Sequence, residues 1–190
     1  PFPANILGSV SSSPLHMASV FATIANSGQQ CKPQSIESVT DRDENVLKEF
    51  TADCKEVISP DVANKTAALL TASAGQYYTS TRLGDGRPFA AKSGTTDDHA
   101  NTWLTGFTPS LATSAWVGHG DNSSQEVSGV VINGVYHSEI FGETYVGQNI
   151  WAPYMTQALA GTPIEAVSNA NIGATTPQRG ATPTPAPKQQ

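Results

Sequence analysis

Residues 86–96 read GRPFAAKSGTT, and this stretch decides the fold of the chain. Its first residues belong to the run 84–88, in which glycine, aspartate and proline favour a turn. Residues 89–95, which follow, predict a strand launched by that turn. Residues 101–109 read NTWLTGFTP and predict a second strand over 102–107. Because the two strands follow each other closely, we expect them to pair in antiparallel fashion.

A third strand is predicted over residues 111–118, which read LATSAWVG, because Thr108, Pro109 and Ser110 favour a turn before it. After the polar, glycine-rich stretch 120–147, apolar residues at helical spacing mark a terminal helix that should lie across the sheet. They are Ile150, Trp151, Tyr154, Met155, Ala158 and Leu159.

Two helices are predicted before the sheet, each with both ends marked. In the first, Ser13 can cap the N-terminus, Pro14 fits the first turn and Gly28 follows the last turn. Ser59, Pro60 and Gly75 mark the second in the same order. The expected core-facing stripes are Met17, Ala18, Phe21, Ile24 and Ala25 in the first helix and Val62, Ala63, Thr66, Ala67 and Leu70 in the second. Helices that flank an antiparallel sheet place the chain in the α+β class.

Between the two helices, residues 34–40 and 46–50 are short β-leaning runs separated by turn-favouring residues 41–45, which suggests a hairpin. Cys31 and Cys54 bracket it and could meet across paired strands as a disulfide in an oxidising compartment. Closing a loop of this length gains about 3 kcal/mol in the chain-entropy model. The alternative is two unpaired small core residues.

Composition and charge exclude several function classes. A net charge of -6 with only 10 lysines and arginines lacks the basic surface that nucleic-acid binding needs. No run of about 18 apolar residues occurs, so any membrane anchor would lie upstream. No cofactor or metal is expected, because the four histidines lack zinc-site spacing. Residues 1–161 are expected to form the folded part, and the Thr/Pro/Ala-rich residues 162–190 a disordered tail.

Several linked segments carry a family resemblance. Lys92-Ser93-Gly94 resembles the Lys-Thr/Ser-Gly box of the penicillin-binding proteins and serine β-lactamases. The wider context is similar to the bifunctional, class A penicillin-binding proteins, whose pattern continues through Gly-Tyr-Thr-Pro to Trp-Val-Gly. Residues 106–109 and 116–118 match these two segments.

The likeness runs from about Leu7 to Gly161 in the family's order. It includes the helix that begins at Ser13, which is similar to the helix that the family places after its second active-site box. The resemblance implies a serine β-lactamase-like or transpeptidase-like fold and, more narrowly, the C-terminal portion of a penicillin-binding transpeptidase domain.

The resemblance also implies roles for individual residues. Ser93 and Thr95 would bind the terminal carboxylate of a D-alanyl-D-alanine stem peptide or of a β-lactam, with Gly94 and Thr96 beside them. The Thr95 N–H would be an oxyanion-hole donor, a role worth roughly 3 to 4 kcal/mol in other acyl-transfer enzymes. Lys92 would be a fixed positive charge that assists proton transfer and attracts the carboxylate.

The physics of an edge strand fits these roles, because such a strand can present backbone groups to an extended peptide. By the period of two, Ser93 and Thr95 share one face while Lys92 and Gly94 share the other. Gly94 lets another segment or side chain approach closely. We therefore expect residues 89–95 to form the rim of a cleft.

No Ser-x-x-Lys followed by Ser-x-Asn precedes the helix at Ser13, although the family places its nucleophilic serine and lysine base there. We therefore expect the chain to start inside the domain and to fold against an N-terminal part of the same protein. That part would carry the nucleophile and an anchor to the extracytoplasmic face of the bacterial cell membrane. The implied function is part of a peptidoglycan D,D-transpeptidase, inhibited by β-lactams, with the chain inactive alone.

Other interpretations remain open at this point. The chain could be a non-catalytic cell-wall-binding module that keeps the cleft, whereas a β-lactamase-like hydrolase needs a deacylating base that nothing identifies. Asp97, Asp98 and His99 near Ser93 suggest a hydrolase triad, but contiguous residues rarely reach relay geometry. The tryptophans are expected in the core and Arg87 on a surface turn.

Overall fold

The structure is a computed structural model that describes residues 3 and 8 and the ranges 10–121 and 124–167. Its helices are α1 (Pro14–Ala25), α2 (Pro60–Tyr77), η2 (Gly142–Trp151) and α3 (Ala152–Ala158). Its strands are β1 (Gln29–Cys31), β2 (Ser38–Thr40), β3 (Val46–Glu49), β4 (Cys54–Glu56), β5 (Ala90–Thr95), β6 (Asn101–Thr108), β7 (Leu111–Gly118), β8 (Val130–Ile132) and β9 (Val135–His137).

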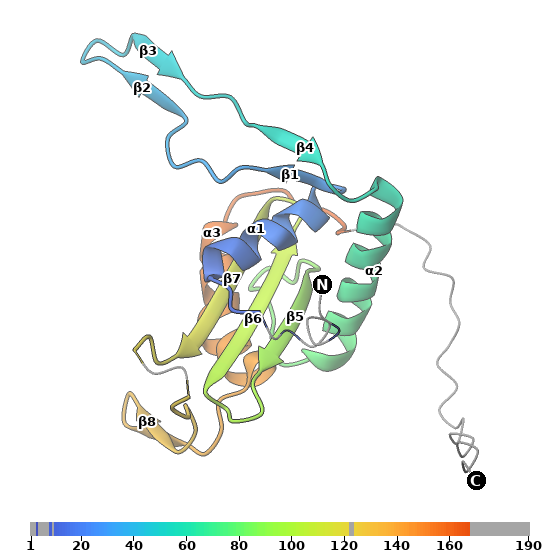
Figure 1. Cartoon of the computed structure of the whole chain (residues 1–190), viewed down its shortest axis with the longest axis vertical. Helices are drawn as coiled ribbons and strands as arrows, with labels where there is room; N and C mark the ends of the chain where they lie inside the picture. The colour runs from blue at the N-terminus through green and yellow to red at the C-terminus, as the bar shows by residue number, and fades with distance from the viewer. Residues whose placement is uncertain (1–2, 4–7, 9, 122–123, 168–190) are drawn as a thin grey trace.

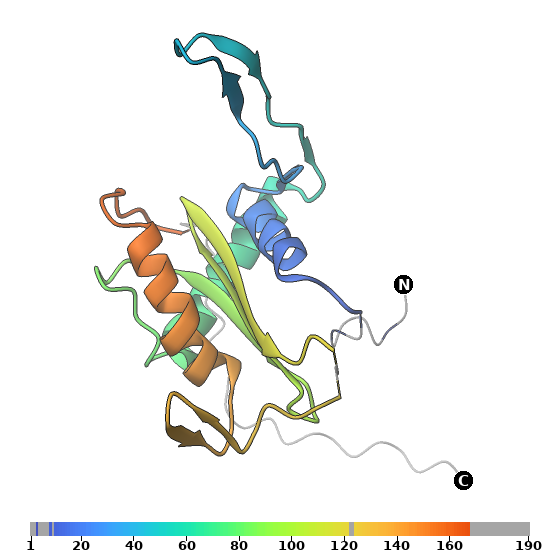
Figure 2. The same cartoon turned by 90° about the vertical axis from the view of Figure 1, so that its left-hand side faces the viewer.

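Three layers make up the body of the molecule. The central sheet has the order β5-β6-β7 and is antiparallel throughout. Helix α1 lies on one face and η2 with α3 lies on the other, whereas α2 runs along the side of the sheet formed by β5 (Figure 2). The predicted α+β class, the strand order and the helix across the sheet are confirmed.

Each face of the sheet has its own apolar cluster. On the α1 side, Phe21 meets Phe107 edge-to-face at 6.3 Å between ring centroids, with Ala67 of α2 and Ala90 beside them. On the η2 and α3 side, a larger cluster surrounds Trp151, which is fully buried. Because the sheet is covered on both faces, β6 is buried along most of its length.

The helix starts follow their predicted caps. The Ser13 hydroxyl accepts the His16 N–H at 3.2 Å, and the Ser59 hydroxyl accepts the Val62 N–H at 3.5 Å. Gly28, at φ +89°, ends the first helical segment as predicted.

The predicted end of α2 at Gly75 is wrong, because the helix continues to Tyr77. A single glycine costs a helix only about 1 kcal/mol, which packing of Ala67 and Ala74 against the body offsets. Val62, expected in the buried stripe, is 51% exposed. Ala63 and Ala67 of the predicted stripe are buried, and Ala74 is buried as well.

A two-stranded arm projects from the body (Figure 1). Its outer part is the predicted hairpin, in which β2 pairs with β3, and its base is the pair β1 and β4. Cys31 and Cys54 lie directly opposite each other across that base and form the predicted disulfide. At the tip, the side chain and the backbone N–H of Asn45 donate hydrogen bonds to Asp41, and these bonds stabilise the turn. The side-chain bond and then the backbone bond lower the pKa of Asp41.

The stretch 120–147 contains secondary structure that was not predicted, because the stretch is polar and rich in glycine. Within the described residues it includes the hairpin of β8 and β9 and the start of η2. Hydrogen bonding in η2 is of the i to i+5 type: the Val146 N–H donates to the Phe141 carbonyl. In the terminal helix Trp151, Met155 and Leu159 are buried, whereas Ile150 and Tyr154 are exposed.

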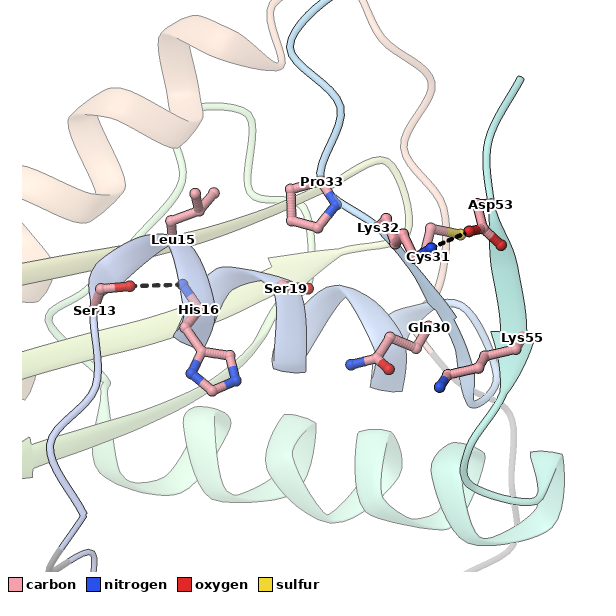
Figure 3. A pocket seen from close by; sticks show the side chains of 10 residues that line it. All are labelled: Ser13, Leu15, His16, Ser19, Gln30, Cys31, Lys32, Pro33, Asp53 and Lys55. Atoms are coloured by element: carbon pink, nitrogen blue, oxygen red, sulfur yellow. Dashed lines mark hydrogen bonds and ion pairs between the residues drawn. The ribbon is translucent and has the colours of Figure 1, made fainter. Parts of the chain in front are cut away.

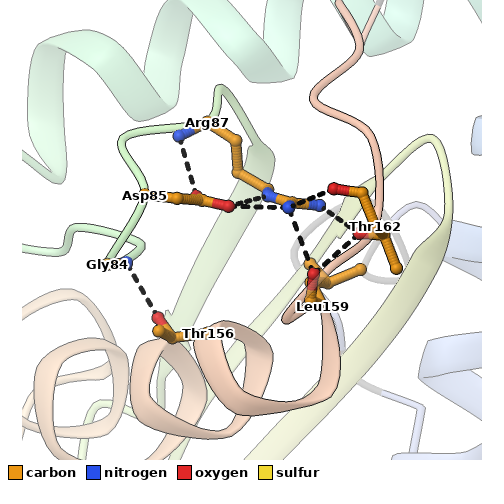
Figure 4. Close-up of polar contacts among 6 residues, drawn as sticks. All are labelled: Gly84, Asp85, Arg87, Thr156, Leu159 and Thr162. Atoms are coloured by element: carbon orange, nitrogen blue, oxygen red, sulfur yellow. Dashed lines mark hydrogen bonds and ion pairs between the residues drawn. The ribbon is translucent and has the colours of Figure 1, made fainter.

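Arg87 was expected on a surface turn, but it is buried, with an exposed fraction of 5%. Figure 4 shows its polar contacts. Its guanidinium donates to Asp85 at 2.8 Å, to the Leu159 carbonyl at 3.2 Å, and to the hydroxyl and carbonyl of Thr162. These bonds tie the turn before β5 to the segment after α3. Of the expected tail, Thr162 is therefore held by the body, and residues 168–190 lie outside the described residues.

Replacing Arg87 with alanine is expected to lower the free energy of unfolding of the protein by about 2 to 4 kcal/mol, because two backbone carbonyls lose a charged donor. Urea unfolding measures the effect. Arg87 also lowers the pKa of Asp85 by hydrogen bonding. The stability that this Arg87–Asp85 bond contributes is present above the ordinary aspartate pKa and is lost as the pH falls through the lowered pKa. Arg82→Ala, at an exposed position, is the control, and equal unfolding of the two variants would contradict the prediction.

Candidate active site at the edge of β5

Strand β5 is an edge strand of the central sheet in the described part of the chain, because β6 is its one strand neighbour. The Ser93 N–H points away from β6 and donates to the Tyr78 hydroxyl at 2.8 Å. Backbone groups two residues apart on a strand point the same way, so the Thr95 N–H also points outward. The next residue points inward again, since the Thr96 N–H donates to the Asn101 carbonyl. The predicted oxyanion donor thus lies on the open edge.

The accessible rim is shorter than the predicted 89–95. Ala90 and Ala91 are fully buried, so their backbone is shielded from an incoming peptide. At Ser93, Tyr78 takes the N–H and the Lys92 ammonium donates to the carbonyl at 2.8 Å. The rim that a ligand can pair with therefore begins at Thr95.

Ser93 and Thr95 both lie on the sheet face that η2 covers. Gly142 of η2 sits so close to Ser93 that a Cβ there would lie 2.9 Å from the Ser93 Cβ. The Thr95 hydroxyl meets that of the buried Thr102 at 3.2 Å. Each hydroxyl carries one donor and two acceptor sites, so both keep capacity for a further partner. Their shared face matches the prediction from period two.

The Lys92 ammonium brings the positive charge of the site. Its side chain is exposed, and its Nζ reaches around to the outward carbonyl of Ser93. A charge in this position lies at the same edge as the Thr95 N–H. The edge thereby combines a cation, a backbone donor and two hydroxyls, a set suited to an anionic group.

Gly94 lies on the opposite face, where a Cβ added to it would have the Trp103 Cβ as its nearest heavy atom, at 3.9 Å. The space over Gly94 is thus not filled by the described residues. Trp103 is only partly buried, and its ring packs at a tilt against that of Trp116, with 6.0 Å between ring centroids. The expectation of core holds for Trp151 but not for Trp103, which borders the space over Gly94.

The turn after β5 does not form a relay. Hydrogen bonds from the Thr96 side chain and then the Ala100 backbone lower the pKa of Asp98. The His99 ring packs edge-on against Phe141 at 5.4 Å, and no hydrogen bond between His99 and Ser93 is found among the described residues. Thr96 itself bonds to Asn101 and closes the turn. The hydrolase triad therefore has no geometric support here.

A hollow of about 470 Å³ lies elsewhere, between α1 and the base of the arm (Figure 3). His16, Lys55 and the ion pair of Lys32 with Asp53 line it, and β5 contributes no lining residue. A hydrogen bond to Asp53 raises the pKa of Lys32, and the same bond lowers the pKa of Asp53. Both partners are largely exposed, so the pair contributes little stability.

Comparison with known proteins decides the family. Residues 4–135 match the family model described as the penicillin binding protein transpeptidase domain. The chain belongs to this family. Over 190 residues it is 35% identical to penicillin-binding protein 1A of Mycolicibacterium smegmatis, in a match that covers 95% of the chain and 23% of that relative.

Solved penicillin-binding proteins share the fold. The structure of PonA1 from Mycobacterium tuberculosis superposes with a TM-score of 0.74 at 29% identity, over 97% of this chain and 49% of that one. Penicillin-binding protein A from M. tuberculosis, solved as an imipenem acyl-enzyme complex, gives 0.53 at 26% identity, over 59% and 27%. The chain therefore spans less than half the length of these transpeptidase relatives.

The structure adds site neighbours that the sequence did not single out. Tyr78 and Gly142 both contact Ser93, and they come from the end of α2 and the start of η2. Neither belongs to a transpeptidase motif quoted above. Both come from elements other than β5 and contact Ser93 only in the folded chain. In the described residues, no group of three or more His, Cys, Asp and Glu side chains is arranged to hold a metal.

Proposed function

We propose that this chain supplies the carboxylate-binding and oxyanion-stabilising half of a serine D,D-transpeptidase site. The outward Thr95 N–H, beside the Lys92 ammonium and the hydroxyls of Ser93 and Thr95, carries the proposal. Such an edge can pair with the backbone of an extended ligand and grip its acid end. Membership of the transpeptidase family supports it further.

The proposed reaction has two steps. A serine from the N-terminal part of the protein attacks the carbonyl between the two D-alanines, and the tetrahedral oxyanion receives a hydrogen bond from the Thr95 N–H. The amide C–N bond breaks, a proton passes to the leaving nitrogen and D-alanine departs. The amine of a neighbouring stem peptide then attacks the ester, forms a new amide and returns the proton to the serine. A β-lactam enters the same first step and stays attached.

The intact protein is proposed to act outside the cytoplasm, on the cell wall. The disulfide between Cys31 and Cys54 supports this, because such bonds persist in oxidising compartments. In the described residues no helix is long and apolar enough to cross a membrane.

A fluorescent penicillin tests the proposal. The complete transpeptidase domain, meaning this chain with its N-terminal part, is expected to be labelled covalently on a serine and to gain the mass of one penicillin. This chain alone is expected to stay unlabelled. Preincubation with unlabelled penicillin is the control for specific labelling. A complete domain that folds and gains no label would contradict the proposal and favour the non-catalytic module.

A further inference from the structure

Tyr78 joins the end of α2 to the middle of β5. It is 4% exposed, and its ring belongs to the apolar cluster that includes Leu83 and Ala91. Its hydroxyl emerges from that cluster at the outer edge of β5. There it accepts the Ser93 N–H at 2.8 Å and donates to the Ser93 Oγ at 3.3 Å. One rigid side chain thus holds both the backbone and the side chain of Ser93.

The direction of these bonds fixes what the Ser93 hydroxyl can do. Because the Tyr78 O–H donates to Oγ, that oxygen already acts as an acceptor, and its own proton is left to donate. A hydroxyl that accepts one hydrogen bond becomes a better donor in the next one. The series of hydrogen bonds from the Tyr78 hydroxyl to the Ser93 hydroxyl therefore ends in the Ser93 O–H as a donor. A carboxylate, which only accepts hydrogen bonds, needs such a donor.

Serine needs such a holder more than threonine does. Threonine is branched at Cβ and has a restricted χ1, whereas serine lacks the methyl group and rotates more freely. Gly142 lets η2 approach the Ser93 Cβ from one side, and Tyr78 reaches it from the strand edge. Both contacts limit the rotation of a side chain that would otherwise be loose.

We propose that Tyr78 is a positioning residue that orients the Ser93 hydroxyl to bind the carboxylate of the acyl donor. The inference rests on the proposed function and deepens it, since it assigns the recognition of the acid group to a pair of residues. Tyr78 itself does not touch the ligand. It acts by setting the donor direction of Ser93 and by closing the strand edge just before Thr95.

The test compares benzylpenicillin with its methyl ester, which lacks the charged carboxylate. In the complete domain, Tyr78→Phe keeps the buried ring and removes only the hydroxyl. The second-order rate constant of acylation by the acid is expected to fall roughly tenfold, while that for the ester changes less than about twofold. The preference for acid over ester therefore drops. A purely structural role would lower both rates equally, and that result would overturn the inference.

Two variants complete the comparison. Tyr77→Phe removes a neighbouring hydroxyl from a side chain that is 65% exposed, and it should leave both rates unchanged. Ser93→Ala should lower the preference for the acid, and adding Tyr78→Phe to it should lower the preference no further. Additive effects of the two changes would mean that Tyr78 does not act through Ser93.

The outcomes separate this inference from the proposed function. If the unaltered domain is not acylated, the proposed function fails and the inference with it. If Ser93→Ala keeps the acid preference, the role of Ser93 fails. If Ser93→Ala lowers the preference but Tyr78→Phe does not, the inference alone fails.

Hydrogen exchange of the unaltered domain gives a measurement that needs no variant. The Ser93 amide should be strongly protected although it points away from β6, because Tyr78 accepts its proton. The Thr95 amide, which points the same way, should exchange faster in the absence of ligand. Equal exchange at Ser93 and Thr95 would overturn the inference even if Tyr78→Phe failed to fold.

Discussion

Replacing Thr95 with proline in the complete domain is expected to slow acylation by a fluorescent penicillin about 10²- to 10³-fold, the loss typical of one oxyanion donor. Proline lacks the N–H and leaves the rest of the backbone in place. Because that N–H points to the open edge and not toward β6, its loss removes no hydrogen bond from the sheet. Proline is tolerated at such positions of edge strands. Burst kinetics of labelling measure the rate.

Two controls divide the effect between backbone and side chain. Thr95→Ser keeps the N–H and the hydroxyl and should label at close to the unaltered rate. Thr95→Val keeps the N–H and loses only the hydroxyl, so it should label more slowly than serine but much faster than proline. Normal labelling of a folded Thr95→Pro domain would show that the oxyanion is stabilised elsewhere.

Replacing Lys92 with alanine is expected to lower the acylation rate by about 10² to 10⁴, the range for a lost proton-transfer group. The change removes the cation at the strand edge and its bond to the Ser93 carbonyl. Lys92 is exposed, so the variant should unfold at nearly the same temperature as the unaltered domain. Stopped-flow labelling with penicillin and thermal unfolding measure the two quantities.

The matched control for Lys92 is another exposed lysine. Lys65→Ala removes an ammonium that pairs with Asp61 at 2.8 Å on the outer side of α2. It lowers the net charge by the same amount and should leave labelling unchanged. Equal labelling of the Lys92 and Lys65 variants would refute the role of Lys92 in proton transfer and carboxylate attraction.

Local signals predicted much of the fold. Ser13 and Ser59 start helices because a cap depends only on the next three residues. The turns at 84–88 and 108–110 and the strands beside them follow from short-range preferences. Cys31 and Cys54 could be paired because each borders the predicted hairpin.

The features that the sequence did not reveal depend on contacts between distant segments. Helix α2 passes through Gly75 because its alanines pack on the body. Arg87 is buried because the segment after α3 supplies two carbonyls to its guanidinium. A polar residue before a proline carries no local sign of such a partner.

The same division holds within the site. The motif named Lys92, Ser93, Gly94 and Thr95, and the alternation of a strand placed them on the correct faces. Tyr78 could not be found in this way, because it lies fifteen residues before Ser93 and meets it only through the docking of α2 on β5. The shorter rim likewise follows from burial of Ala90 and Ala91, which the edge-strand argument did not include.

A crystal structure of the complete domain acylated by benzylpenicillin tests the central claim most directly. We expect the carboxylate of the bound penicillin within hydrogen-bond distance of the Ser93 and Thr95 hydroxyls. The carbonyl oxygen of the acyl-enzyme ester should lie about 2.7 to 3.1 Å from the Thr95 nitrogen. An acyl group that lies away from β5, with its carboxylate held by other residues, would contradict the account.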